Sequence, residues 1–259
     1  MSKKRTFSVL VALVMLVMTA GQARAALIDP LGVLDLSANG GLNPTTGLAW
    51  QAGDTFRLAF VSAGTRNATS TNINDYNTFV QNAANASSLG LGAATWKVIA
   101  STETVNARVN TGTTGSGGEA IFLVDGLTQV ANNYGDLWNG NVDNPISLDE
   151  NGNVRAASVW AGTTPGGATV TNRWLGTVIP SKTNNTVVVV EHGRSDHFHS
   201  DGHWIQQFNN GPTASQSLYG LSNPITLREA VTVPEPATAT LALLGLGGLM
   251  MRRRRDLKA

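Results

Sequence analysis

Apolar segments at both ends of the chain confine any soluble domain to the residues between them. Near the N-terminus, three basic residues precede an apolar run at 9–18, which is followed by the small residues Ala23 and Ala25. This order is typical of a secretory signal peptide over residues 1–25, with cleavage after Ala25. The run is shorter than the ~20 residues of a stable membrane span, so we expect export by the Sec machinery. An uncleaved N-terminal anchor is the alternative.

Residues 26–232 remain, and their composition predicts one extracytoplasmic globular domain. Asn, Thr, Ser and Gly fill the stretches between apolar runs, as they do where short strands are joined by many turns. The chain has no cysteine, which excludes disulfides and thiolate metal sites. Stability must therefore come from the core, and a domain of this length buries about 70% of its unfolded surface, which suffices.

The small net charge of the chain hides an acidic middle. The formal net charge is +1, but the two ends carry 9 of the 18 basic residues and only 2 of the 17 acidic ones. Nucleic-acid binding needs cations that displace the counterions of a polyphosphate, so this class of function is disfavoured. An acidic surface suits a secreted, soluble module.

Alternating apolar residues predict a fold dominated by strands. Phe56, Leu58 and Phe60 alternate with Arg57 in the two-residue period of a half-buried strand. Asp125-Gly126 suits a tight hairpin turn after another such run. Strands are expected at 55–62, 95–101, 119–124, 154–160, 185–191 and 217–227.

One helix is expected between the first two of these strands. Apolar residues recur every three or four positions from Ile73 to Ala84. Asn72 is a suitable N-cap, Asp75 favours the first turn electrostatically, and Gly90 is a suitable end. The chain is therefore expected to have an α+β fold in which strands dominate.

Five segments then follow one another in a recognisable order. After the helix, which is expected to end near Leu91, come "TWKVIAST", "EAIFLVDG", "DLWNG" and "VWAGTTPGG". This order resembles that of endostatin-like domains of the C-type-lectin-like fold, over roughly residues 55–175. The resemblance implies that a helix packs on a twisted mixed set of strands and that long loops carry any ligand. Endostatin-like domains are disulfide-linked and often basic, so their zinc site and heparin binding are not carried over.

A histidine-rich segment is the most unusual local feature. Asp196 and Asp201 lie among the four histidines of the chain, which are His192, His197, His199 and His203. Imidazole and carboxylate ligands suit Zn or Cu(II), but the spacing matches no established zinc signature. A metal site, a solvated loop and a ligand-contact loop all stay open, as does a protonation switch near pH 6.5.

No catalytic signature is present, so we predict that the protein is not an enzyme. The sequence lacks a G-x-S-x-G elbow, a P-loop and an H-E-x-x-H motif. An alternative hydrolase would depend on the clustered acids Asp143, Asp149 and Glu150. Asp149 also begins an alternation typical of calcium loops, but Val154 stands where the glycine is required, which favours a turn. We expect at least three of Trp138, Trp160, Trp174 and Trp204 to be core residues.

The C-terminal tail at 233–256 combines three features in a fixed order. They are the triplet Pro234, Glu235 and Pro236, an apolar run at 237–251, and the basic cluster Arg252, Arg253, Arg254 and Arg255. The prolines block a helix from entering from upstream. As a helix the apolar run is ~22 Å long, so it crosses ~30 Å of hydrocarbon only marginally. We predict a transmembrane helix at about 237–251 with the arginines on the cytoplasmic side.

This tail resembles the PEP-CTERM sorting signal. The resemblance implies a Gram-negative export route in which an exosortase, a membrane protease or transpeptidase, recognises Pro234-Glu235-Pro236 and releases or transfers the protein outward. Proteins with this signal are linked with extracellular matrix, biofilm or floc formation. An ordinary C-terminal membrane anchor is the alternative.

The sequence therefore predicts a non-enzymatic protein that resides in the inner membrane during transit and ends at the outer surface or outside the cell. Its expected fold is α+β, strand-dominated and C-type-lectin-like with long loops, plus a C-terminal transmembrane helix. Its expected partners are the exosortase, the membrane and an exopolysaccharide or another surface polymer, with no nucleic acid. The alternatives are a secreted metal-binding protein with Zn or Cu on the histidine segment, and a secreted hydrolase.

Overall fold

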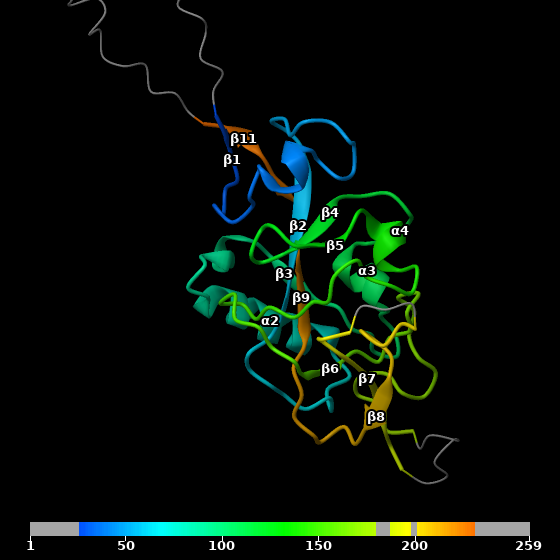
Figure 1. Cartoon of the computed structure of the whole chain (residues 1–259). Coiled ribbons are helices and arrows are strands. Elements are labelled where there is room, and N and C mark those ends of the chain that lie inside the picture. The colour runs from blue at the N-terminus through cyan, green and yellow to red at the C-terminus, as the bar shows by residue number, and fades with distance from the viewer. Residues whose placement is uncertain (1–25, 180–186, 198–200, 231–259) are drawn as a thin grey trace, which may run out of the picture. The chain divides into compact units, whose positions relative to one another are not determined.

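A mixed β-sheet organises the part of the chain that the computed structural model describes, which is residues 26–179, 187–197 and 201–230. The strand order is β3-β9-β2-β4-β5, and β10 pairs with the start of β2 (Figure 1). β2 and β4 are parallel, and the other pairs of this sheet are antiparallel. The strands are β2 Thr55–Val61, β3 Trp96–Val98, β4 Ala120–Leu123, β5 Gln129–Ala131, β9 Tyr219–Ser222 and β10 Ile225–Thr226.

The central strand β2 is buried on both faces, so the predicted half-buried strand is wrong on this point. One face carries Phe56, Leu58 and Phe60 into a core that includes helix α2 and Trp96. The opposite face carries Ala59 and Val61 into a second core that contains Trp204 and Tyr219. Because both faces are covered, Arg57 is only 4% exposed rather than solvated as its alternation with apolar residues suggested.

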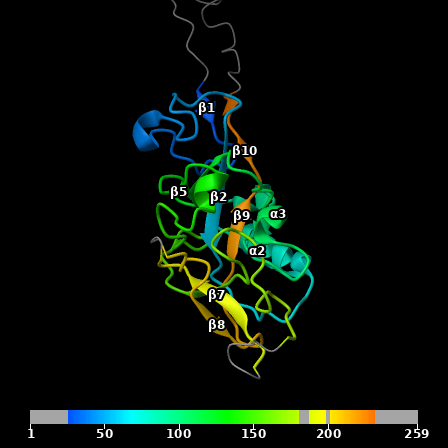
Figure 2. The ribbon, with the colours of Figure 1, turned by 90° about the vertical axis from the view of Figure 1, so that its right-hand side faces the viewer.

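Helix α2 Ile73–Ala86 confirms the helix predicted after the first strand. The side chain of Asn72 accepts a hydrogen bond from the backbone N–H of Asn74, as expected for an N-cap. The helix ends before Gly90, because Ser87 leaves the helical conformation and its N–H donates to Ala84 O. Figure 2 shows α2 on one side of β2 and β9.

The predicted turn at Asp125-Gly126 joins β4 to β5. Asp125 Oδ1 accepts the backbone N–H of Leu127 at 3.0 Å and that of Thr128 at 2.9 Å. Gly126 has φ +66°, and a Cβ at this position would lie 1.9 Å from the carbonyl oxygen of Val33. The close approach of the two backbones therefore requires glycine.

A second, smaller sheet has the order β6-β7-β8 and is antiparallel throughout. It contains β6 Ser158–Trp160, β7 Val190–Arg194 and β8 Phe208–Asn210. The strand predicted at 154–160 exists only at its end, as β6. The strand predicted at 185–191 overlaps β7 at Val190 and Glu191, and β7 continues to Arg194. The backbone N–H of Trp160 donates to Ser217 O at 3.0 Å, which links this sheet to the segment that leads into β9.

Short elements complete the described structure. They are β1 Leu27–Ile28, which pairs with β11 Arg228–Glu229, the helices α3 Ala107–Thr111 and α4 Tyr134–Leu137, and the 3₁₀ turns η1 Ala38–Gly41 and η2 Leu91–Ala93. The predicted strand-dominated fold with few helices is confirmed. The C-type-lectin-like architecture stays a prediction.

Several predicted features lie outside the described residues. They are the signal peptide at 1–25, His199, and the tail with its triplet, its helix at 237–251 and its four arginines. Within the ranges that the structure does describe, no helix is both long and apolar enough to cross a membrane.

Candidate functional site

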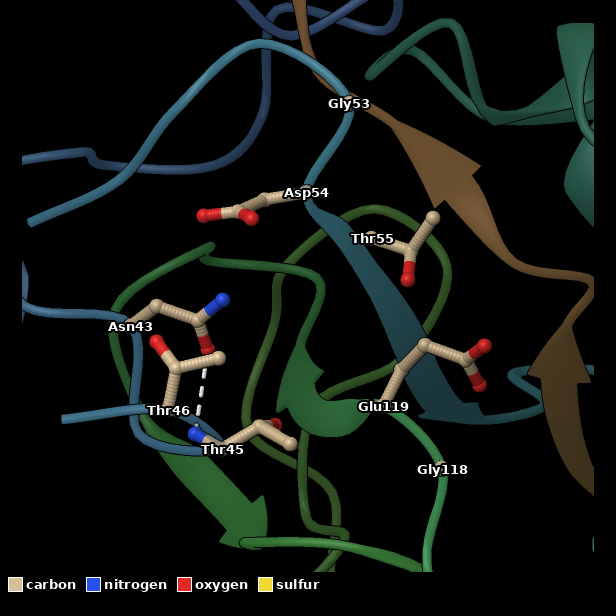
Figure 3. Close-up of a pocket in the computed structure, with 8 residues that line it drawn as sticks. All are labelled: Asn43, Thr45, Thr46, Gly53, Asp54, Thr55, Gly118 and Glu119. Atoms are coloured by element: carbon tan, nitrogen blue, oxygen red, sulfur yellow. Dashed lines mark hydrogen bonds between the residues drawn. The ribbon is translucent and has the colours of Figure 1, made fainter. Parts of the chain in front are cut away.

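A polar pocket lies where the parallel strands β2 and β4 begin (Figure 3). Parallel strands start at the same edge of a sheet, so the residues that precede them come together although they are far apart in the chain. The pocket has a volume of about 280 Å³. It is lined by Asn43, Thr45 and Thr46 from an N-terminal loop, Gly53, Asp54 and Thr55 at the start of β2, and Gly118 and Glu119 just before β4.

The N-terminal loop is held by its own turn and by the sheet. Asn43 Oδ1 accepts the N–H of Thr45 at 3.0 Å, and Asn43 O accepts the N–H of Gly47 at 2.8 Å. Thr45 Oγ1 accepts the N–H of Ala120 at 3.0 Å and donates to Asn132 O at 3.2 Å. The loop is thereby attached to the start of β4 and to the segment that follows β5.

Asp54 is fixed by the chain on both sides of it. Its Oδ2 accepts the N–H of Gln51 at 3.0 Å, and its carbonyl oxygen accepts the N–H of Leu227 at 2.8 Å. Gly53, which precedes it, has φ +96°, a conformation that glycine adopts readily. In Figure 3 the Asp54 carboxylate lies above Asn43 and Thr46.

Glu119 is held by two side chains from neighbouring segments. The hydroxyl of Tyr134 donates to Glu119 Oε2, and Arg57 Nε lies 3.5 Å from the same oxygen. Arg57 is itself buried, and its guanidinium donates to Thr111 O at 2.8 Å. The guanidinium carbon also lies 5.1 Å from the centre of the Tyr134 ring.

The ionisation of these groups follows from their burial. Burial lowers the pKa of Arg57, partly offset by Tyr134 and Glu119. Burial, followed by the hydrogen bond to Glu119, raises the pKa of Tyr134 to about 12. Tyr134 is therefore a neutral hydrogen-bond donor at physiological pH, and it orients the Glu119 carboxylate.

Gly118 allows the Tyr134 ring to lie against the backbone beside Glu119. A Cβ at Gly118 would lie 2.4 Å from a ring carbon of Tyr134, and φ at Gly118 is +96°. Both the contact and the dihedral angle therefore require glycine at this position.

The side chains that line the pocket are mostly polar. It offers two carboxylates, three hydroxyls and one carboxamide, with no lysine, arginine, histidine or aromatic side chain among the lining residues. Hydroxyls, amides and carboxylates can form hydrogen bonds with a ligand that is rich in hydroxyl groups.

Sequence reasoning missed this pocket because each contributing segment looks like an ordinary turn. The stretches "NPTTG", "AGDT" and "GSGGE" contain the turn residues of many loops. Only the parallel pairing of β2 with β4 brings two of these stretches together. Without a predicted strand order, no local signal marks the site.

The described histidines fall into two groups rather than one cluster. His192 lies in β7, where its ring is 5.8 Å from that of Trp160 and 5.9 Å from that of Phe208, and burial lowers its pKa. The rings of His197 and His203 lie 5.9 Å apart, in the loop that follows β7. Across residues 26–179, 187–197 and 201–230, no group of three or more His, Cys, Asp or Glu side chains could hold a metal ion.

Two acidic residues of the histidine segment are paired locally. Asp196 accepts two hydrogen bonds from Arg194, at 2.9 and 2.8 Å, and Asp201 Oδ2 lies 2.8 Å from His203 Nδ1. These contacts are those of an exposed polar loop, in agreement with one of the three interpretations of this segment.

Two of the acids considered for a hydrolase hold backbone N–H groups. Asp149 Oδ1 accepts the N–H of Asn151 at 2.9 Å and that of Asn153 at 3.0 Å, which closes the predicted turn. Glu150 Oε2 accepts the N–H of Ala63 at 2.8 Å. Both side chains therefore stabilise the local fold, and neither lines the pocket.

The third acid, Asp143, lies on another loop. Its pKa is raised, first by burial and then by the charge of Asp136. Its Oδ2 accepts a hydrogen bond from Gln129 at 3.2 Å. It does not line the pocket either.

The four tryptophans that the sequence analysis considered as core residues are all buried. Their exposed fractions are 4% for Trp138, 0% for Trp160, 9% for Trp174 and 0% for Trp204. The prediction that at least three belong to the core is confirmed, so none of the four offers an exposed ring for stacking against a ligand.

Comparison with known proteins identifies the end of the chain. Residues 232–255 match the PEP-CTERM protein-sorting motif, as the order of triplet, apolar run and arginines predicted. No curated protein matches the chain. The motif implies sorting by an exosortase, with transit through the membrane and export to the cell surface.

Proposed function

We propose that this exported protein is a non-enzymatic component of the extracellular matrix or biofilm and that it binds an exopolysaccharide or another surface polymer. The PEP-CTERM motif at 232–255 carries the proposal, because it directs the protein to the surface where such polymers are found. The acidic, cysteine-free middle of the chain and its many loops agree with this role.

The polar pocket supports the binding part of the proposal. Sugar hydroxyls both donate and accept hydrogen bonds, and the pocket presents both kinds of partner on side chains held by the surrounding backbone. Preorganised polar groups bind at a smaller entropic cost than mobile ones. The predicted C-type-lectin-like architecture would place ligands on loops, and the pocket is built largely from loops.

The two alternative functions have less support. The separation of His192 from His197 and His203 does not favour a metal-binding role, since no described cluster has enough ligands. The contacts of Asp149 and Glu150 with backbone N–H groups do not favour a hydrolase, since both are used structurally.

A strain that lacks the gene tests this role in the matrix. Complementation with the full chain should restore the amount of protein in the isolated matrix fraction and its co-sedimentation with the exopolymer of the strain. A chain without residues 232–255 should be made but should not reach that fraction. If the purified wild-type protein does not co-sediment with the exopolymer, polymer binding is wrong.

A further inference from the structure

The two ends of the globular part of the chain meet in a short ribbon. Strands β1 and β11 pair with each other, and the carbonyl oxygen of Ala26 accepts the backbone N–H of Ala230 at 2.6 Å. Ala26 is also the first residue of the mature chain if the signal peptide is cleaved after Ala25 as predicted. We call residues 26–28 and 228–230 the terminal ribbon. It joins the predicted mature N-terminus to the stretch that leads into the sorting motif.

Hydrogen bonds accompany the chain all the way into this ribbon. Thr226 in β10 pairs with Thr55 at the start of β2. The backbone N–H of Leu227 donates to Asp54 O at 2.8 Å, and its carbonyl oxygen accepts the N–H of Gly53 at 3.0 Å. Leu227 is buried, and β11 begins at the next residue. The last described stretch before the sorting motif is therefore paired backbone rather than a free linker.

The tether between the terminal ribbon and the sorting triplet is short. Three residues, at 231–233, separate Ala230 from Pro234. A fully extended chain spans at most ~3.6 Å per residue, so Pro234 lies within ~14 Å of Ala230. Even a compact domain of about 100 residues has a radius of gyration of ~13 Å. An exosortase that engages the triplet therefore meets the terminal ribbon as well.

The ribbon offers side chains for such a contact. Leu27 packs against the core that contains Phe56. Successive side chains of a strand point to opposite faces, and the next residue, Ile28, is 44% exposed. The paired strand β11 adds the exposed charged residues Arg228 and Glu229. An exposed apolar side chain beside charged ones has the composition of a small protein–protein contact, with an apolar centre and a polar rim.

We infer that the terminal ribbon is a docking surface for the exosortase, which contacts Ile28 and β11 while it acts on the sorting signal. The length of the chain beyond Ala230 identifies this partner, because the enzyme that handles the motif must come within reach of the ribbon. Polymer binding plays no part in this inference, which rests instead on the sorting motif at 232–255.

Docking on the ribbon couples sorting to folding. The two strands of the ribbon come from opposite ends of the domain, so β1 leaves the export machinery first and β11 leaves it last. The ribbon can therefore form only when the whole domain has been exported. An enzyme that recognises the ribbon acts on completed domains and passes over chains that are still unfolded.

Pulse-chase labelling of the full chain, in a strain that has the exosortase, tests the contact. Release of the tail is followed as the shift to the smaller mature form. The first variant carries a Gly-Ser linker of about twelve residues between Ala230 and Val231, which leaves the ribbon and the signal unchanged but separates them. Effective concentration falls roughly as the −3/2 power of tether length, so a tether about five times longer should slow release by about tenfold.

A point variant tests the ribbon surface itself. Ile28→Thr keeps a β-branched residue in the strand but removes the apolar contact, and it should slow release by about fivefold, as expected for a central contact residue. Val154→Thr is the matched control, since Val154 is an 83% exposed apolar residue outside the ribbon, and its release should equal that of the wild type. Unchanged melting temperatures of both purified variants show that the domain is retained.

The possible outcomes separate this inference from the account of sorting. Release of the linker variant at the wild-type rate or faster overturns the inference, because the ribbon then gives the enzyme no hold. Equal release of Ile28→Thr and wild type overturns it too, since distance alone would then govern the rate. Sorting by the exosortase and binding to the exopolymer stand in both cases. Absence of tail release in the wild-type chain would contradict the sorting itself.

Discussion

Two glycines of the pocket allow the contact between backbone and Tyr134 to be measured directly. Gly53 and Gly118 both have φ +96°, so alanine carries the same backbone strain at either position. They differ in their surroundings: a Cβ at Gly118 meets the Tyr134 ring at 2.4 Å, whereas a Cβ at Gly53 meets no heavy atom within 4 Å. Gly53→Ala is therefore the matched control for Gly118→Ala.

The expected losses of stability follow from the backbone strain and from the contact with the Tyr134 ring. A left-handed conformation costs an L-residue about 1–2 kcal/mol, which both variants lose from the free energy of unfolding. Overpacking against the ring adds about 1–3 kcal/mol for Gly118→Ala alone. Displacement of Tyr134 also removes its hydrogen bond to Glu119, so this variant should bind the polymer more weakly as well.

Urea denaturation of the purified protein gives the comparison. Gly118→Ala should lose clearly more stability than Gly53→Ala. This difference should disappear when each change is made separately in a Tyr134→Ala background. An equal loss in the two single variants would show that the ring contact has no energetic importance, and the account of how Glu119 is positioned would then be wrong.

Three further predictions concern ionisation and a turn. The pKa of Tyr134 is raised to about 12 from an ordinary value near 10. The stability that the neutral phenol contributes is therefore complete below about pH 10 and should be lost as the pH rises toward about 12. Across this pH range, the melting temperature of Tyr134→Phe should fall less than that of the wild type. Burial lowers the pKa of His192, so the unfolded chain takes up a proton more readily than the folded one, and stability should fall as the pH drops below about 6.5. In His192→Gln the melting temperature should fall less over the same pH range. An equal fall in the variant and the wild type would contradict this prediction. Asp149→Ala leaves the N–H groups of Asn151 and Asn153 without their acceptor and should lower the free energy of unfolding by about 1–3 kcal/mol in urea denaturation. Asp149→Asn should lower it by less. An unchanged free energy of unfolding in both variants would mean that solvent replaces the carboxylate.

Local features of the sequence predicted the local structure well. The spacing from Ile73 to Ala84 and the cap at Asn72 give helix α2, and Asp125-Gly126 gives the β4–β5 turn. Each of these signals acts through hydrogen bonds or side chains within a few residues. Contacts with distant parts of the chain therefore have little effect on them.

Features that depend on distant contacts could not be predicted in the same way. Arg57 alternates with apolar residues as a solvated side chain would, yet it is only 4% exposed, and its partners Glu119 and Thr111 lie more than fifty positions away. The pocket has the same origin, because it depends on the parallel pairing of β2 with β4. Strand order, rather than any single motif, creates the site.

The sorting tail is the opposite case, since its order of triplet, apolar run and arginines is local and specific. The mass of the protein recovered from outside the cell tests this central claim most directly. Processing by an exosortase predicts a mature C-terminus that lacks the basic cluster Arg252–Arg255, in cells that express the full chain. Recovery of extracellular protein that still carries these four arginines would contradict the account.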